Sequence, residues 1–429
     1  MRGNNTMVRK LPLHNYLLII LMTGWAFDSM SAGLISGTLP LIVGEFGLSP
    51  SITGVVLSSW LLGMLFGAFL VGVIGDLFGR KKAIILSLTL LGIFNFLSSL
   101  STSWSELILY RVLAGIGSAG YMVVASTLLA EYAPPSIRGM LISFLESSWA
   151  LGWLVAIILA RLIAPVSGWR VIFYTGLLVV FLIPLIYMII PESIRFLLVK
   201  NKTHDAERLA EKIGIDISKY KGVRSGKKSI LDIFRGEYKK RTIMLWIHWF
   251  SIALTYWGIF LWLPQILSMR GLSYVKSVEY AIIITLAQLP GYLTAAWLID
   301  KVGRKKLLAI FMGLGGLGSF LFWSSTTELE VILAGIIISF FNLGAWGITY
   351  AYTPELYPTE LRSTASGSAN SIGRIGGMLG PYIAGYLLSL TSNVMIPFLF
   401  FAIMHFVSAI DAFILGIETK QKSLEEISK

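Results

Sequence analysis

Charges are rare inside the long apolar stretches of this sequence, and five ionisable side chains there stand out: Asp28, Arg111, Glu146, Arg161 and Arg374. Arg161 lies close to the outer end of its predicted helix, where we expect its side chain to extend to the membrane surface. Because moving a charge from water into lipid costs several kcal/mol, such residues face a polar cavity or one another, and they mark functional paths. The chemistry that these residue types offer is binding and proton exchange, since carboxylates take up protons and a guanidinium holds an anion.

Asp28 and Arg111 are the first candidates for proton exchange. With a rise of about 1.5 Å per residue, Asp28 lies about 20 Å into its predicted helix and Arg111 lies about 9 Å from the far end of its own, so both occupy the same half of the membrane. An ion pair keeps a carboxylate ionised, and exchanging the arginine for a proton changes the local charge, which is a possible form of coupling switch. A static salt bridge is the alternative. Glu146, on the next predicted helix, is the third candidate for proton coupling.

Arg374 is the candidate for binding a substrate anion. It lies near the middle of its predicted helix, and a guanidinium offers two parallel N–H donors that match a carboxylate. The alternative is that Arg374 pairs with Glu146 or Asp28 inside the cavity. Four polar and aromatic residues at similar depth in other predicted helices are expected to line the same binding site: Tyr256, Gln288, Asn342 and Trp346.

A second group of charged residues occurs twice in the chain, in register. Each member of the first copy has a counterpart 224 positions later. The pairs are Asp76 with Asp300, Gly79 with Gly303, Arg80 with Arg304, Glu131 with Glu355, and Arg138 with Arg362. A repeat of this length indicates two equivalent halves, which is a common construction of secondary transporters. We expect each glycine to allow a tight turn, and each glutamate to pair with the arginine seven positions after it.

Membrane-spanning helices are the elements that must position these residues. Hydrophobic residues make up 55% of the chain and charged residues only 14%, against about 25% charged residues in a soluble protein. Apolar runs recur that approach or exceed the ~18–20 residues of a spanning helix. The expected fold is an all-α membrane protein with twelve transmembrane helices in two pseudo-symmetric six-helix bundles. The first bundle covers residues 1–190, a polar linker with short helices covers 191–240, and the second bundle with a short tail covers 241–429.

The apolar runs give the expected helix limits, and the basic residues give the orientation. The predicted helices are 15–39, 51–74, 82–100, 105–132, 138–163, 169–190, 241–269, 277–299, 305–324, 328–354, 361–389 and 393–416. Of the 35 Lys and Arg residues, only Arg170, Arg270 and Lys276 fall in loops opposite the termini. The positive-inside rule therefore predicts a cell-membrane protein with both termini and the linker in the cytoplasm. The basic residues are spread along the membrane edges, which argues against nucleic-acid binding. The chain contains no cysteine, so it has no disulfide and no thiolate site.

Several motifs resemble those of the major facilitator superfamily. The first charged cassette, Gly72–Lys82, is similar to the signature loop GxxxDxxGRK of that superfamily, and Arg111–Gly120 is similar to its RxxxGxGxxG motif. The run Pro191–Leu197 reads PESIRFL and resembles the PESPRFL run of sugar porters, with Glu418–Lys420 as a degenerate copy. The resemblance covers nearly the whole chain and implies the two-bundle major facilitator fold.

Two further motifs resemble particular branches of the superfamily. The run Tyr352–Arg362 resembles the corresponding run of bacterial niacin transporters, the synaptic-vesicle-protein group and organic-ion transporters. The run Phe27–Gly33 resembles the FDAMDxG motif of the niacin-type group. It departs from that motif at Ser31, which stands where the group has a second aspartate.

The resemblance implies roles for the charged residues. Related proton-coupled sugar porters pair an acidic residue on helix 1 with an arginine on helix 4, which is the placement of Asp28 and Arg111. Organic-anion and niacin transporters imply a substrate-binding arginine on helix 11, as at Arg374. The repeated charges, together with Glu192 and Arg195 after helix 6, are expected to latch the cytoplasmic side in the outward-open state. The alternative is that they only orient the loops.

The expected function is secondary active transport by alternating access. No catalytic set, metal cluster or GK[ST] phosphate loop is evident in the sequence, so neither an enzyme, a cofactor nor an ATP-driven pump is expected. The favoured interpretation is a monomeric, proton-coupled symporter of a small organic carboxylate, with aromatic carboxylates included. Its partners are then protons, the substrate and the lipid bilayer. A proton-coupled sugar transporter, a drug exporter and a non-transporting membrane receptor on the same fold are the alternatives.

Overall fold

The computed structural model describes residues 12–134, 137–213, 217, 230–391 and 393–420. Residues 214–216 and 218–229 of the predicted linker lie outside the described part of the chain. The helices of the first half are α1 (Leu13–Phe46), α2 (Pro50–Phe78), α3 (Arg80–Ser98), α4 (Trp104–Tyr132), α5 (Arg138–Phe173), α6 (Thr175–Ile189), α7 (Ile194–Val199) and α8 (Thr203–Ile213). Those of the second half are α9 (Tyr238–Met269), α10 (Tyr274–Leu286), α11 (Gln288–Val302), α12 (Arg304–Ser324), α13 (Glu328–Glu355), α14 (Thr359–Thr391) and α15 (Ile396–Leu415).

The prediction of twelve membrane-spanning helices is confirmed. In the described part of the chain, 11 helical stretches are both long and apolar enough to cross a membrane. The twelfth is α14, which has 33 residues but a more polar composition, rich in Ser and Gly. Its small residues allow close packing: a Cβ atom on Gly376 or Gly380 would collide with the backbone oxygen of Phe250 or Leu254 on α9. Such close approach is typical of helices that pack in membranes.

The helix labels do not coincide with the spans at two places. The fifth span ends at Ser167, and Gly168, with a φ of 77°, reverses the chain direction before the sixth span, Trp169–Ile189, which is divided between the end of α5 and α6. The eighth span divides into α10 and α11 at Ala287. The nearby Pro290 has no N–H to donate to the preceding turn, which weakens the helix there.

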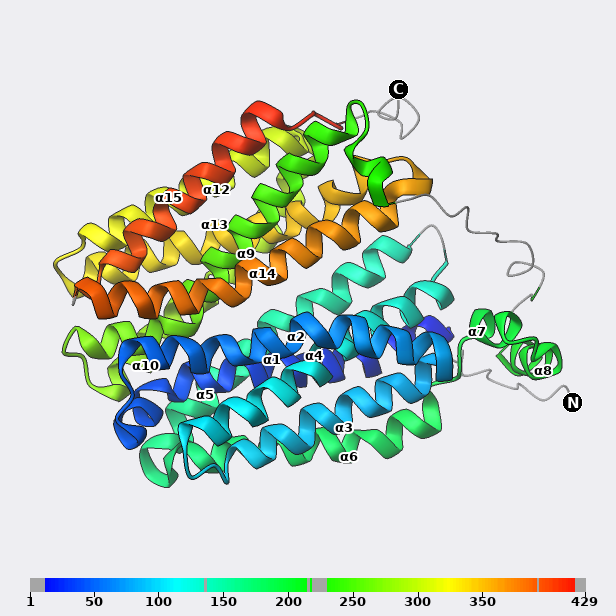
Figure 1. Cartoon of the computed structure of the whole chain (residues 1–429), viewed down its shortest axis with the longest axis horizontal. Coiled ribbons are helices and arrows are strands. Elements are labelled where there is room, and N and C mark those ends of the chain that lie inside the picture. Colours follow the sequence, from blue (N-terminus) through cyan, green and yellow to red (C-terminus); the bar gives the residue numbers. More distant parts are fainter. Residues whose placement is uncertain (1–11, 135–136, 214–216, 218–229, 392, 421–429) are drawn as a thin grey trace, which may run out of the picture.

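The helices form two bundles that lie side by side (Figure 1), and α7 and α8 project beyond one end of the first bundle. Helices α1, α2 and α5 of the first bundle contact α9, α14 and α10 of the second. The charged cassettes at the ends of α2 and α11 lie at the same end of the molecule as α7. We call this the cassette end, and the other the far end.

Candidate functional site

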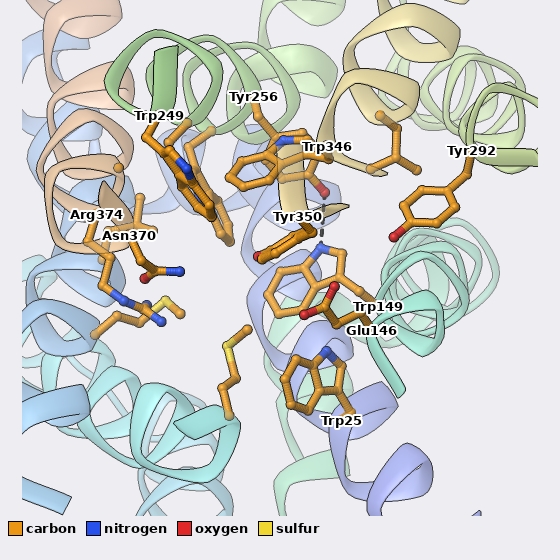
Figure 2. Close-up of a pocket in the computed structure, with 17 residues that line it drawn as sticks. Trp25, Glu146, Trp149, Trp249, Tyr256, Tyr292, Trp346, Tyr350, Asn370 and Arg374 are labelled. Carbon is orange, nitrogen blue, oxygen red and sulfur yellow. Dashed lines mark hydrogen bonds between the residues drawn. The ribbon is translucent and has the colours of Figure 1, made fainter. Parts of the chain in front are cut away.

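A central cavity of about 120 Å³ lies between the two bundles. Eight aromatic residues from both bundles line it: Trp25, Trp149, Trp249, Tyr256, Trp257, Tyr292, Trp346 and Tyr350. The charged and amide side chains of the lining are Glu146, Asn370 and Arg374. Figure 2 shows Arg374 and Asn370 on one side of this space and Glu146 on the other, with aromatic rings between them. The cavity therefore suits a flat, apolar molecule with polar groups at its edge.

Of the residues predicted to bind substrate, three line the cavity and two do not. Arg374, Tyr256 and Trp346 are part of the lining. Asn342 instead lies fully buried within the second bundle, where its Nδ2 atom is 2.9 Å from Nε2 of His405 and 3.2 Å from the Thr255 hydroxyl. Gln288 is also fully buried, at the start of α11, and is absent from the lining. Both side chains therefore point away from this cavity.

Arg374 has its full hydrogen-bonding capacity available for a ligand. Within the described residues, its guanidinium makes no hydrogen bond or ion pair with the protein. Among the described residues, Arg374 makes no direct ion pair with Glu146 or Asp28, although it is close enough to Asp28 for an electrostatic attraction between the two. Asn370 lies one helical turn before Arg374, so the two side chains share a face of α14. Sequence reasoning missed Asn370, although its spacing from Arg374 would have indicated it.

Several other unpredicted residues of the lining are aromatic, and the remainder are small or aliphatic. Trp25 is one turn before Asp28 on α1, and Trp149 is one turn after Glu146 on α5. The Trp149 indole donates a hydrogen bond of 3.0 Å to the Tyr256 hydroxyl, which joins the first bundle to the second (Figure 2). The abundance of tryptophan on the predicted helices was the available signal, since aromatic residues that meet a cavity stack on flat ligands.

The expected ion pair between Asp28 and Arg111 is not formed. Both side chains are fully buried in the first bundle, but Arg111 donates to Ser31 O at 3.0 Å and to Asn95 Oδ1 at 3.3 Å. Its guanidinium also stacks on Trp60, 4.2 Å from the ring centroid. Among the described residues, neither carboxylate oxygen of Asp28 has a hydrogen-bond partner.

A second cavity of about 480 Å³ connects the central site with the cassette end. The two cavities share Glu146, Tyr292 and Tyr350. Arg362 and Glu355 also line the second cavity, close to the end of α13. The central site is thus reached from the cassette end in this structure.

The far end is closed by contacts between the bundles. The Ser36 hydroxyl donates to Phe260 O at 2.7 Å, and the Ser58 hydroxyl donates to Met378 O at the same distance. Arg161 forms a salt bridge of 2.6 Å with Glu279 of α10. Arg161 therefore does more than extend its charge towards the membrane surface, which is the role that its position alone suggests.

The repeated charges form two matching clusters, one in each bundle. In the first, Arg80 contacts Asp76 at 2.6 Å and Glu131 at 3.8 Å, and its backbone N–H donates to Glu192 at 2.8 Å. The carboxylate of Glu192 thus caps the N-terminus of α3, where the helix dipole favours a negative charge.

The second cluster repeats this arrangement. Arg304 contacts Asp300 at 2.8 Å and Glu355 at 3.1 Å, and its backbone N–H donates to Glu418 at 2.8 Å. Gly303 has a φ of 100°, against 110° for its counterpart Gly79. Glu418 was not among the predicted gate residues, although it follows the last helix as Glu192 follows the sixth.

Other members of the predicted gate are placed differently from the expectation. Glu131 and Glu355 form ion pairs with Arg80 and Arg304, and among the described residues Glu355 makes no ion pair with Arg362. Arg138 is exposed at the start of α5. Arg362 donates to Pro354 O at 2.9 Å. Arg195 is exposed on α7. Within the described residues, each of these clusters is confined to one bundle, so no latch joins the bundles at the cassette end in this structure.

Comparison with known proteins identifies the family. Residues 18–429 match the family described as "Sugar (and other) transporter". The chain is 35% identical to the niacin transporter NiaP of Acinetobacter baylyi, covering 98% of both chains. It is 38% identical to the putative niacin/nicotinamide transporter NiaP of Bacillus subtilis, covering 95% of this chain and 97% of the relative.

More distant proteins agree with this assignment. The benzoate transport protein of Acinetobacter baylyi is 27% identical over 88% of this chain and 84% of its own. Among solved structures, the xylose transporter XylE of E. coli superposes with a TM-score of 0.79 at 21% identity, over 96% of this chain and 99% of the other, which shows the fold. The chain therefore belongs to the sugar (and other) transporter family of the major facilitator superfamily.

Proposed function

We propose that this protein is a proton-coupled symporter that moves a small aromatic carboxylate across the cell membrane by alternating access. The observation that carries the proposal is the guanidinium of Arg374, which makes no hydrogen bond with any described residue, in a cavity walled by eight aromatic residues. A guanidinium holds a carboxylate through two parallel hydrogen bonds, and aromatic walls bury the flat ring. The names of the relatives agree with this chemistry, because niacin and benzoate are both planar aromatic carboxylates.

Protons are proposed to couple through Asp28. This carboxyl group is fully buried and has no hydrogen-bond partner among the described residues, and Arg374 and Arg111 attract it without forming a direct ion pair with it. Arg111 is held nearby in the same bundle by Ser31 and Asn95. Protonation of Asp28 therefore changes the net charge of the buried region around Arg111, which is the type of change that biases two conformations of a transporter.

The orientation and the gating follow from the same proposal. The cassette end faces the cytoplasm, with both termini and the linker 191–240, and the bundles 1–190 and 241–429 move as units around the central site. In the state that opens at the far end, the cassette end must close, and Arg80 and Arg304 are then in a position to strengthen that closure. The monomer suffices for this cycle.

Transport into liposomes tests the proposal. Purified protein should accumulate radiolabelled nicotinate above equilibrium when a pH gradient, acidic outside, is imposed, and an uncoupler should abolish the accumulation. A non-transporting receptor would bind nicotinate and accumulate nothing. A sugar transporter is the second candidate, because the family includes sugar transporters. Saturable accumulation of a neutral sugar, with no competition from nicotinate or benzoate, would favour it.

A further inference from the structure

The central cavity has two polar sides that come from different bundles. Arg374 and Asn370 belong to α14 of the second bundle, and Glu146 belongs to α5 of the first. Figure 2 places the Glu146 carboxyl across the cavity from Arg374, beyond the rings of Trp149 and Tyr350. If the proposed carboxylate substrate is bound by Arg374, the opposite edge of its ring faces Glu146.

Glu146 has no partner that would neutralise it or use its hydrogen-bonding capacity. Within the described residues, no hydrogen bond or ion pair to its side chain is formed, and it borders both the central cavity and the one that leads to the cassette end. One aromatic residue that lines the same cavity, Trp149, donates a hydrogen bond of 3.0 Å to Tyr256. A polar group buried against a ligand without a protein partner is complementary to a polar atom of that ligand, because leaving it unpaired is costly.

We propose that Glu146 is a specificity-determining residue, which shares one proton with a basic nitrogen on the substrate while Arg374 holds the carboxylate. One proton is shared in both protonation states of this pair. A protonated Glu146 donates to a neutral ring nitrogen, and an ionised Glu146 accepts a hydrogen bond from a protonated ring nitrogen. The ligand class is a planar aromatic carboxylate that carries a basic ring nitrogen or amine away from the carboxylate. This inference rests on the proposed function, and it assigns Glu146 to substrate recognition and leaves coupling to Asp28.

The test compares two ligands of the same shape. Nicotinate has a ring nitrogen where benzoate has a C–H group, so the ratio of their affinities isolates the contribution of that atom. Isothermal titration calorimetry on the purified full-length protein should show nicotinate binding at least ~10-fold more tightly than benzoate, as a hydrogen bond to a charged group implies. In Glu146→Leu the ratio should fall to about one, because nicotinate weakens and benzoate does not. In Glu146→Gln, which keeps a hydrogen-bond donor and loses the acid, the ratio of the two affinities should lie between those of the unaltered protein and Glu146→Leu.

Controls separate this inference from the function on which it rests. Glu207→Gln, on the exposed face of α8, should leave both affinities unchanged. A thermal melt of each variant establishes that it is folded, and Glu146→Gln preserves the shape of the site. Equal weakening of both ligands in Glu146→Gln, or equal affinities in the unaltered protein, would overturn the role of Glu146. If Arg374→Ala leaves both affinities unchanged, the carboxylate site itself is wrong.

Discussion

Arg161 and Glu279 form a salt bridge that joins the two bundles at the far end of the molecule. Both the Nε and Nη2 atoms of Arg161, on α5, donate to the same carboxylate oxygen of Glu279, on α10, at 2.9 and 2.6 Å. The hydroxyl of Tyr274 lies beside them, 3.1 Å from Gly37 O and 3.0 Å from Ala160 O. The cavity reaches the cassette end in this structure, so these contacts must separate before the site can open at the far end.

The first prediction is that removing this salt bridge favours opening at the far end. The two side chains are 32% and 43% exposed, so the pair contributes only about 0.2–1 kcal/mol. Arg161→Ala should therefore change the ratio of the two conformations by a factor of about 1.5–5, in favour of the one that opens at the far end. A cysteine placed at Ser143, in the cavity that leads to the cassette end, should react correspondingly more slowly with a maleimide.

Two variants control for the effect of a lost arginine. Arg170 also forms a salt bridge at the far end, but its partner Glu45 belongs to the same bundle, so Arg170→Ala should not change the labelling of Ser143→Cys. The exchange of charges, Arg161→Glu with Glu279→Arg, should restore the original rate. Equal labelling rates in Arg161→Ala and the parent would show that the bridge does not affect the conformation.

The second prediction concerns the anion site. Arg374→Ala should weaken nicotinate and benzoate binding roughly 10- to 100-fold, the equivalent of about 1.5–3 kcal/mol for hydrogen bonds to a charged group. Arg374→Lys should weaken binding less, because lysine keeps the charge and loses the planar pair of donors. Calorimetry measures both, with Arg208→Ala on exposed α8 as the control. A tight-binding sugar that is indifferent to Arg374→Ala would replace the carboxylate proposal.

The third prediction concerns coupling. Asp28→Asn mimics the protonated carboxyl, so it should abolish accumulation of substrate driven by a pH gradient and retain exchange of labelled for unlabelled substrate. Liposome uptake and counterflow measure the two activities separately. Asp205→Asn, in the first turn of α8, is the matched control. Accumulation at the parental rate by Asp28→Asn would mean that the coupled proton binds elsewhere.

The fourth prediction concerns the cassette turn. A methyl group on Gly79 would collide with the Glu192 carboxylate, and the φ of 110° disfavours any other residue there. Gly79→Ala should thus lower the melting temperature of the purified protein, at a cost of about 1–3 kcal/mol. Gly72→Ala is the control, because no atom lies within 4 Å of its added methyl group. A similar melting temperature for the two variants would contradict the packing described for Gly79.

The fifth prediction concerns orientation. The chain contains no cysteine, so single cysteines report directly on sidedness. An impermeant maleimide added to intact cells should label Ser105→Cys, which is exposed at the far end, and should spare Ser225→Cys in the linker, outside the described residues. Labelling of Ser225→Cys from outside would show that the linker faces the outside and that the predicted orientation is wrong.

The number of spans and the internal repeat were determined by the sequence alone. Both depend on local properties: an apolar run of sufficient length forms a helix in lipid whatever surrounds it, because its backbone must satisfy its own hydrogen bonds. The expected fifth and sixth helices, 138–163 and 169–190, correspond to spans Arg138–Ser167 and Trp169–Ile189. The offset of 224 residues likewise placed Asp76 and Asp300 in equivalent positions, and the two clusters confirm that equivalence.

The faces of the helices were decided only by the tertiary structure. Counting residues from a helix end gives the expected depth of a side chain but not the direction in which it points. The rotation of each helix about its axis depends on how its ridges pack against neighbours that are distant in the sequence. That packing turned Arg374 towards the cavity and Asn342 towards His405, and it directed Arg111 to Ser31 and Asn95 instead of Asp28. The partners of buried charges in a membrane bundle are therefore set by this rotation, which no single helix encodes.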